Sequence, residues 1–263
     1  MRKVTGDNAI IGATRMKYIY SLSLFGVILL TGGFLSCRSM LCRSTPDAHE
    51  AVYIEPVRFD IEDRGTDYPV HRDVQTTLFY IGEYSRGRHF LLNNRSSAWT
   101  GKWVESYGGI DHPDKRENHL PAGFEPLENP FYCALPYNDL NGSGHKENAS
   151  IIYWSREIRS REVERITSYC KNRWVRIAFG DRVCYAQWQD VGPYETDDAA
   201  YVFGTGKPAN RINEAAGLDL SPACFHYLGM EDNGRTDWQF VEFFDVPDGP
   251  WLDTITISNP CWD

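Results

Sequence analysis

The sequence lacks several features that define common protein classes. It has no internal repeat, no coiled-coil heptad and no Cys-x-x-Cys pair, which argues against repeat arrays, coiled coils and zinc sites of that type. Positive charge is scarce, with 27 Lys and Arg against 36 Asp and Glu. Nucleic-acid binders usually carry a basic face, so we expect no nucleic-acid partner. The seven His are scattered, and we expect no metal and no cofactor.

What the chain does contain is typical of a folded globular protein. Hydrophobic residues make up 42% of the 263 residues and aromatic residues 14%, enough for a sizeable core and too many for a disordered chain. The length allows one large domain or two small ones.

Residues 1–37 have the features of an export signal. Met16 and Lys17 precede a short apolar run and then small residues up to Cys37, the order found in secretory signals. The run is too short for a comfortable membrane span, and Met16 itself is a candidate start. Leu35-Ser36-Cys37 resembles a bacterial lipobox, in which Cys37 is lipidated and anchors the protein to a membrane. The alternative is plain secretion; both predict a cell-envelope or periplasmic protein.

Export also permits disulfide bonds. Cysteines in the predicted folded region and at its entrance are Cys42, Cys133, Cys170, Cys184, Cys224 and Cys261. Six thiols allow three bridges, but the sequence does not select the pairing. Buried free thiols are the alternative.

The mature chain divides into a linker and lead-in, residues 38–73, and one domain, residues 74–263. Strands are expected at four places where β-branched and aromatic residues gather between turn residues. They are 76–81, 131–137, a hairpin over 174–188 turning at Gly180-Asp181, and 236–244. Residues 82–130 and 140–172 are long insertions, the first of them rich in Gly, Pro, Asn and Asp.

Two segments are expected to be helical. The first is 155–169. The second is 221–228, where Asp219 or Ser221 serves as the N-cap and Gly229 ends the helix. N-capping is the main expectation for Asp219. Many short strands with one or two short helices predict a mainly β fold, a closed barrel rather than a doubly wound sheet.

Four ordered segments carry a family resemblance. They are Thr77-Leu78-Phe79-Tyr80, Ala134-Leu135-Pro136-Tyr137, the run Ala186 to Tyr194, and Leu218-Asp219-Leu220-Ser221-Pro222-Ala223. Together they resemble the double-psi β-barrel proteins of the rare lipoprotein A family, and more loosely expansins, barwin-like proteins and family-45 endoglucanases. The resemblance implies a six-stranded double-psi β-barrel and cleavage of peptidoglycan strands, with Asp190 as the acid. Tyr132 stands where the family has a His, and Val191 where it has an Arg.

A lytic transglycosylase needs one carboxylic acid, which protonates the glycosidic oxygen and then accepts a proton from the sugar's 6-hydroxyl. Asp190 suits this role if an aromatic surround, with Trp188 and Tyr194 as candidates, raises its pKa. The competing interpretation is an Asp that accepts backbone hydrogen bonds before Gly192-Pro193. Tyr132 is a candidate to orient Asp190 or to bind substrate, against a role as a barrel-wall aromatic.

Further substrate-binding candidates are Asp139, against a turn role, and Tyr107, against a core role. Three hypotheses follow. The first is an envelope protein that binds glycan, with peptidoglycan as the expected glycan, and cleaves it through Asp190. The second is a non-catalytic, expansin-like binding or scaffold module, and the third is an envelope lipoprotein that binds a partner protein through its insertions.

Overall fold

The computed structural model describes residues 68–86, 91–156 and 167–256, all within one compact unit, Ala48–Asp263. The predicted signal segment with Cys37, most of the lead-in and most of the expected helix 155–169 lie outside the described residues.

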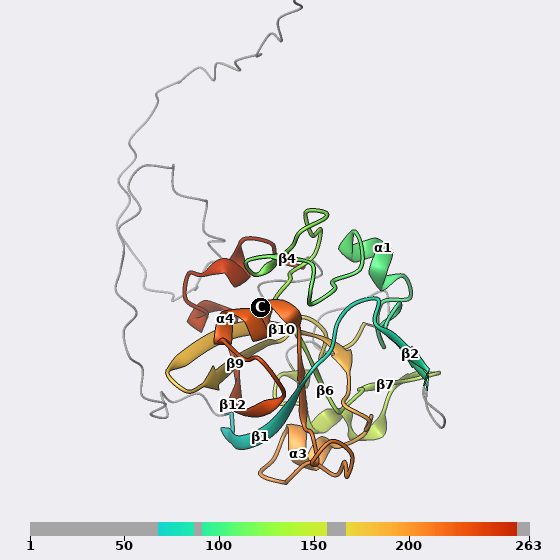
Figure 1. Ribbon diagram of the computed structural model, residues 1–263. Helices are drawn as coiled ribbons and strands as arrows, with labels where there is room; N and C mark the ends of the chain where they lie inside the picture. The colour runs from blue at the N-terminus through green and yellow to red at the C-terminus, as the bar shows by residue number, and fades with distance from the viewer. Residues whose placement is uncertain (1–67, 87–90, 157–166, 257–263) are drawn as a thin grey trace, which may run out of the picture. The chain divides into compact units, whose positions relative to one another are not determined.

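Six strands form a closed barrel in the order β1-β11-β6-β10-β9-β12 (Figure 1). Their bounds are β1 His71–Leu78, β6 Tyr132–Leu135, β9 Trp174–Phe179, β10 Arg182–Val191, β11 Leu218–Leu220 and β12 Gly234–Val241. Two of the pairings, β1 with β11 and β6 with β10, are parallel, and the other four are antiparallel. The expected closed, mainly β barrel is therefore confirmed. Because closure pairs β1 with β12, neither strand leaves a free edge.

The β9–β10 hairpin forms where the sequence predicts it. Arg182 pairs with Phe179, and Gly180 makes the turn with φ of 59°, a conformation that glycine adopts without steric cost. Strand β10 continues three residues beyond the predicted end, to Val191. The last strand, in contrast, ends at Val241 and not at Phe244, because the short helix η2 (Phe243–Asp245) follows it.

Helix α4 (Pro222–Leu228) also forms as expected, and Ser221, one of its two predicted caps, is the N-cap. The Ser221 side chain accepts a hydrogen bond from Cys224 N, and Gly229 ends the helix in the left-handed region. Asp219 lies two residues earlier, inside β11, so the expectation that it caps the helix is wrong. A second short helix, α3 (Ala199–Val202), begins at an Asp198 N-cap and was not expected.

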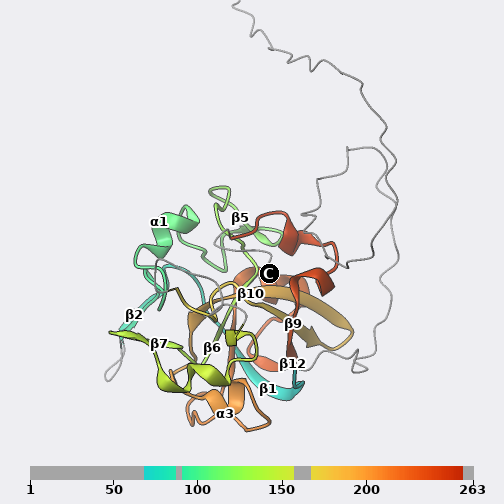
Figure 2. The same cartoon turned by 180° about the vertical axis from the view of Figure 1, so that it is seen from behind.

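The insertion 82–130 contains several short elements. They are β2 (Tyr84–Arg86), β3 (Leu91–Asn93), α1 (Trp103–Tyr107), β4 (Arg116–Glu117) and β5 (Leu120–Pro121). Later loops contain β7 (Leu140–Asn141), β8 (Gly144–His145), η1 (Glu147–Ile151) and η3 (Pro250–Leu252). In both views α1, β4 and β5 lie on one side of the barrel and α3 on the opposite side (Figure 1 and Figure 2).

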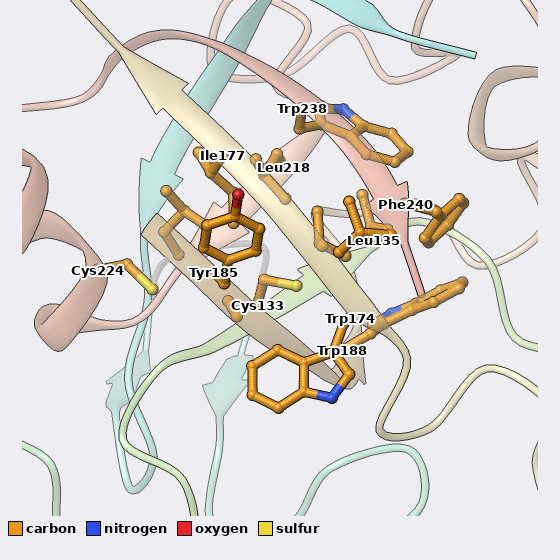
Figure 3. Packing of buried hydrophobic residues seen from close by; sticks show 14 of the residues in the cluster. Cys133, Leu135, Trp174, Ile177, Tyr185, Trp188, Leu218, Cys224, Trp238 and Phe240 are labelled. Carbon is orange, nitrogen blue, oxygen red and sulfur yellow. The ribbon is translucent and has the colours of Figure 1, made fainter. Parts of the chain in front are cut away.

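Alternation along β6 separates two hydrophobic clusters. Cys133 and Leu135 belong to the large cluster that fills the barrel (Figure 3), whereas Tyr132 and Ala134 belong to a smaller cluster with residues of the insertion. Successive side chains of a strand point to opposite faces, so Tyr132 and Ala134 mark the outer face of this strand. The insertion therefore packs on the outside of the barrel, where β6 runs.

A bulge in β10 changes which face its side chains occupy. Trp188 pairs with Cys133 and lies in the barrel core, while Asp190 pairs with Ala134 on the outer face. The register shifts between Trp188 and Asp190, which leaves Gln189 as an extra residue. Without the bulge, the two-residue period would place Trp188 and Asp190 on one face, as the sequence suggested.

The described cysteines are all buried free thiols: Cys133, Cys170, Cys184 and Cys224. The disulfides expected from export are therefore not formed among them. Cys37, Cys42 and Cys261 lie outside the described residues. Within the described segments, no helix has the length and apolar character needed to cross a membrane.

Candidate functional site

Four residues from four neighbouring strands form a row on the outer face of the barrel. Thr77 of β1 pairs with Asp219 of β11, and Asp219 and Asp190 each pair with Ala134 of β6, from opposite sides. Directly paired residues share a face of the sheet, so the row reads Thr77, Asp219, Ala134, Asp190. Ala134 itself is buried under the insertion, so the two part-exposed carboxylates on either side of it are the chemical groups of this row.

Asp219 is the more perturbed of the two acids. It lies between Leu218 and Leu220, which point into the core, and its Oδ1 accepts a hydrogen bond from the Thr77 hydroxyl. Burial raises the pKa of Asp219 to about 7, with the negative charges of Asp190 and Glu83 adding to the effect. Near neutral pH a large share of Asp219 therefore carries a proton and serves as a proton donor.

Asp190 is held by the backbone. Its Oδ1 accepts hydrogen bonds from Ala98 N at 2.7 Å and from Val191 N at 2.8 Å. Burial raises the pKa of Asp190 to about 6, and these two donors oppose the rise, because hydrogen bonds to a carboxylate favour its ionised form. The expected backbone hydrogen bonding of Asp190 is therefore present, and its raised pKa is present as well.

A third carboxyl group, that of Glu83, acts on Asp219 through its charge. Glu83 follows a turn in which Glu83 N donates to Tyr80 O, and burial raises the pKa of Glu83. The turn needs glycine at position 82, since φ is 83° there and a Cβ would lie 2.8 Å from Ile110 Cγ1. Negative charge at Glu83 favours the protonated form of Asp219.

Tyr132 does not contact Asp190. Its fully buried hydroxyl donates to Asp111 Oδ2 at 2.9 Å and accepts from Ile81 N at 3.0 Å. Asp111 Oδ1 in turn lies 2.6 Å from Arg116 Nη1. Tyr132 thus ties the insertion to β6 and is a barrel-wall anchor, the competing interpretation of this residue, rather than a substrate contact.

Three other predicted site residues are also structural. Trp188 is fully buried, and its indole N–H donates to Asp190 O at 2.7 Å. Tyr107 is fully buried in the cluster under the insertion. Asp139 is fully buried too, and it accepts hydrogen bonds from Ser168 Oγ and Tyr169 N. None of these side chains is accessible to a substrate, because each is enclosed by the loops or core that it stabilises.

Tyr194 is the one predicted binding residue that is well exposed, with 54% of its surface accessible. Its loop passes beside the row, since a Cβ placed on Gly192 would lie 3.4 Å from Asp219 Oδ2. The structure thus brings Asp190 and Tyr194 close to Asp219.

Asp219, Thr77 and Ala134 were not predicted as site residues. The pattern Leu218-Asp219-Leu220 already indicates a strand with one polar face, which could have placed Asp219 on a sheet surface. The strand order that brings it beside Asp190 depends on two pairings between distant segments, Asp219 with Ala134 and Asp190 with Ala134.

The described residues contain no group of three or more His, Cys, Asp or Glu arranged to hold a metal ion. Comparison with family models, with curated proteins and with solved structures gave no match, so the interpretation depends on the residues of this chain alone.

Proposed function

We propose that the outer-face row binds a glycan strand and cleaves it by general acid catalysis, with peptidoglycan as the substrate. The observation that carries this proposal is the pair Asp190 and Asp219. Both have a raised pKa, they flank the same residue of β6, and neither forms an ion pair with a cation among the described residues. Carboxylic acids that retain a proton near neutral pH are the usual proton donors for glycosidic oxygens.

Asp219 acts as the acid in this mechanism. It donates its proton to the glycosidic oxygen as the bond from that oxygen to C1 breaks, and positive charge develops on the sugar ring. Asp190, whose ionised form is favoured by two backbone N–H groups, stabilises that charge. The 6-hydroxyl of the same sugar then attacks C1 and returns a proton to the Asp219 carboxylate, which leaves a 1,6-anhydro end. This differs from the sequence-based expectation that Asp190 is the acid.

The motif order supports the same assignment. Each of the four segments that resemble the rare lipoprotein A family supplies one member of the row. A double-psi topology of the barrel is part of this proposal. Tyr132 and Val191 depart from the family pattern, and Tyr132 anchors the insertion instead. Export, with Cys37 as the lipidated residue, remains part of the proposal and places the protein where peptidoglycan is found.

A second candidate reaction is hydrolysis of the same bond. A second carboxylate favours it, because inverting glycosidases use one acid and one base with room for water between them. Asp190 and Asp219 are separated by two strand spacings, roughly 9–10 Å between their Cα atoms. In this reaction Asp190 removes a proton from water, and the product is a reducing end instead of an anhydro end.

The test is incubation of the full-length protein with purified sacculi, followed by mass spectrometry of released fragments. Variants Asp219→Asn and Asp190→Asn are compared with Asp181→Asn, an exposed carboxylate on the β9–β10 turn. We expect Asp219→Asn to lower release by about 100-fold or more, and Asp181→Asn to have no effect.

Each product pattern has a separate meaning. Anhydro ends identify a lytic transglycosylase, and reducing ends that are heavier by one water identify a hydrolase. Binding without release in any protein would contradict cleavage and favour the expansin-like module. Absence of binding to sacculi would contradict the glycan proposal and favour the partner-binding lipoprotein.

A further inference from the structure

Backbone strain in the described chain is concentrated beside the carboxylate row. Seven residues other than glycine have positive φ, and four of them belong to the two loops that flank Asp219. Tyr194 has φ of 59°, and the consecutive residues Asn213, Glu214 and Ala215 have φ of 47°, 58° and 60°. Left-handed residues usually occur singly, since the Cβ clashes with the following carbonyl. Three in succession, next to a fourth on a bulky residue, require support from the surrounding structure.

The loop that carries Tyr194 is closed tightly around it. Glu195 N donates to Pro193 O at 2.6 Å, a three-residue turn centred on Tyr194. With positive φ at the central residue this is the rarer and more strained form of the γ-turn. The turn directs the side chain outward, and 54% of Tyr194 remains exposed.

The second loop is held from inside. The buried Asn210 side chain donates to Ile212 O at 3.0 Å and to Ala216 O at 2.9 Å, and it accepts from Ile212 N. These bonds fix the left-handed run that lies between Ile212 and Ala216. Strand β11, which contains Asp219, begins two residues after Ala216.

One hydrogen bond joins the two strained loops. Asn213 Nδ2 donates to the Tyr194 hydroxyl at 2.7 Å, so the phenol ring is fixed at its outer end by one loop and at its backbone by the other. An exposed ring that serves only solubility or packing has no use for two strained supports. Strain of this kind is found where a side chain must keep one orientation for a ligand.

The position of this ring relative to Asp219 indicates what it holds. Gly192, two residues before Tyr194, lies against Asp219 Oδ2, and the negative charges of Asp219 and Glu83 act on the Tyr194 hydroxyl. An immobilised aromatic face beside an acid suits a pyranose ring, whose axial C–H groups pack on aromatic faces while its hydroxyls reach polar groups at the rim. Asn213, which bonds the hydroxyl end of the ring, supplies such a group.

We propose that Tyr194, fixed by Asn213, is a stacking subsite for one hexopyranose ring of a β-1,4-linked N-acetylated glycan, next to the bond that Asp219 protonates. This inference rests on the glycan-binding function proposed above and adds the position of one sugar. It makes Tyr194 a binding residue and Asn213 a positioning residue.

The test measures binding of chitohexaose, a soluble β-1,4-linked N-acetylglucosamine oligomer, by isothermal titration calorimetry. All proteins carry Asp219→Asn, so that the sugar is not cleaved. Tyr194→Ala is expected to weaken binding about tenfold. Tyr194→Phe keeps the ring and loses the bond to Asn213, so we expect a loss of no more than about threefold, matched by Asn213→Ala. Phe244→Ala is the control, because Phe244 is exposed on η2 and has no contact with the row among the described residues.

The Tyr194→Gly variant distinguishes a loss of the aromatic ring from a loss of the folded structure. Glycine accepts positive φ, so this variant should unfold at a temperature no lower than the parent and yet bind as weakly as Tyr194→Ala. Equal affinity of the parent and Tyr194→Ala would overturn the subsite, and so would absence of chitohexaose binding at millimolar concentration. Cleavage is tested separately, by measuring the fragments that proteins with Asp219 intact release from sacculi. A failure of cleavage therefore does not change the comparison of chitohexaose affinities.

Discussion

Two pairs of aspartates in this protein differ in what surrounds them. Asp111 and Asp139 are fully buried within loops, and each is surrounded by donors: Asp111 by Arg116 and the Tyr132 hydroxyl, Asp139 by Ser168 and the Tyr169 backbone. Asp190 and Asp219 are only partly buried on barrel strands, and no cation pairs with either among the described residues. The more deeply buried pair is therefore also the pair with a basic side chain within ion-pair distance, Arg116 at Asp111 and His145 at Asp139.

The two pairs differ in whether a basic side chain offsets the free-energy cost of burying the negative charge. A buried carboxylate with a cation and hydrogen-bond donors holds the fold together, and removing it leaves its partners unsatisfied. A partly buried carboxylate without a cationic partner costs stability when it ionises, and it persists where that cost has a use.

The largest change in stability is expected at Asp111, whose charge is paired with Arg116. Asp111→Ala leaves the Arg116 guanidinium buried without its carboxylate, and we expect a loss of about 3–5 kcal/mol in the free energy of unfolding. Urea denaturation followed by tryptophan fluorescence measures it. The control is Asp114→Ala, whose side chain is 88% exposed and whose loss should change stability by less than about 0.5 kcal/mol. Equal losses of stability in the two variants would contradict the structural role assigned to Asp111.

A smaller effect of opposite sign is expected at Asp219. The pKa of Asp219 in the folded protein, about 7, lies above the value of about 3.9 in an unfolded chain. Its contribution to stability is therefore fully present below pH 3.9 and is lost as the pH rises through 7. Asp219→Asn removes that loss. The full shift corresponds to about 4 kcal/mol, but solvent screens a part-exposed carboxylate, so we expect a gain of about 1–2 kcal/mol at pH 8 and no gain at pH 4.

Urea denaturation at the two pH values measures this gain, with Asp181→Asn as the exposed control. A destabilisation at pH 8 would show that Asp219 is a structural carboxylate like Asp111, and the proposed division would be wrong.

The smallest effect concerns the hydroxyl next to Asp219. Thr77→Val removes the hydroxyl that donates to Asp219 Oδ1 and keeps the side-chain shape. Because that bond favours the carboxylate, its loss should raise the pKa of Asp219 by about 0.5 to 1, measured by ¹³C NMR titration of the carboxyl carbon. Thr76→Val is the matched control, since the Thr76 hydroxyl bonds Val74 O and Thr236 Oγ1 instead. An unchanged titration in Thr77→Val would mean that burial alone sets the pKa.

Local signals were sufficient for several elements. The β9–β10 hairpin follows from β-branched and aromatic residues on either side of Gly180-Asp181, and α4 follows from Ser221, Pro222 and Gly229. These patterns act over a few residues, so no distant contact is needed to recognise them. Asp190 was predicted as a site residue from the resemblance of the run Ala186 to Tyr194 to a known family segment, and it does lie in the row.

Other features depend on contacts that no local pattern contains. The bulge at Gln189 separates Trp188 from Asp190, and it lies in the pairing of β10 with β6, a strand about 50 residues earlier in the sequence. The burial of Tyr107 and Tyr132 depends on where the insertion packs, which composition alone does not reveal.

The sequence by itself determined that the domain is mainly β, where the hairpin and α4 lie, and that Asp190 and Tyr194 stand at the end of a strand. Only the tertiary structure decided that Asp219 lies in β11, on the same face as Asp190, with Ala134 between them. The reason is barrel closure. Residues from positions 77, 134, 190 and 219 become neighbours only when six strands pair in one register, and burial on that closed surface then sets the proton affinity of each carboxylate.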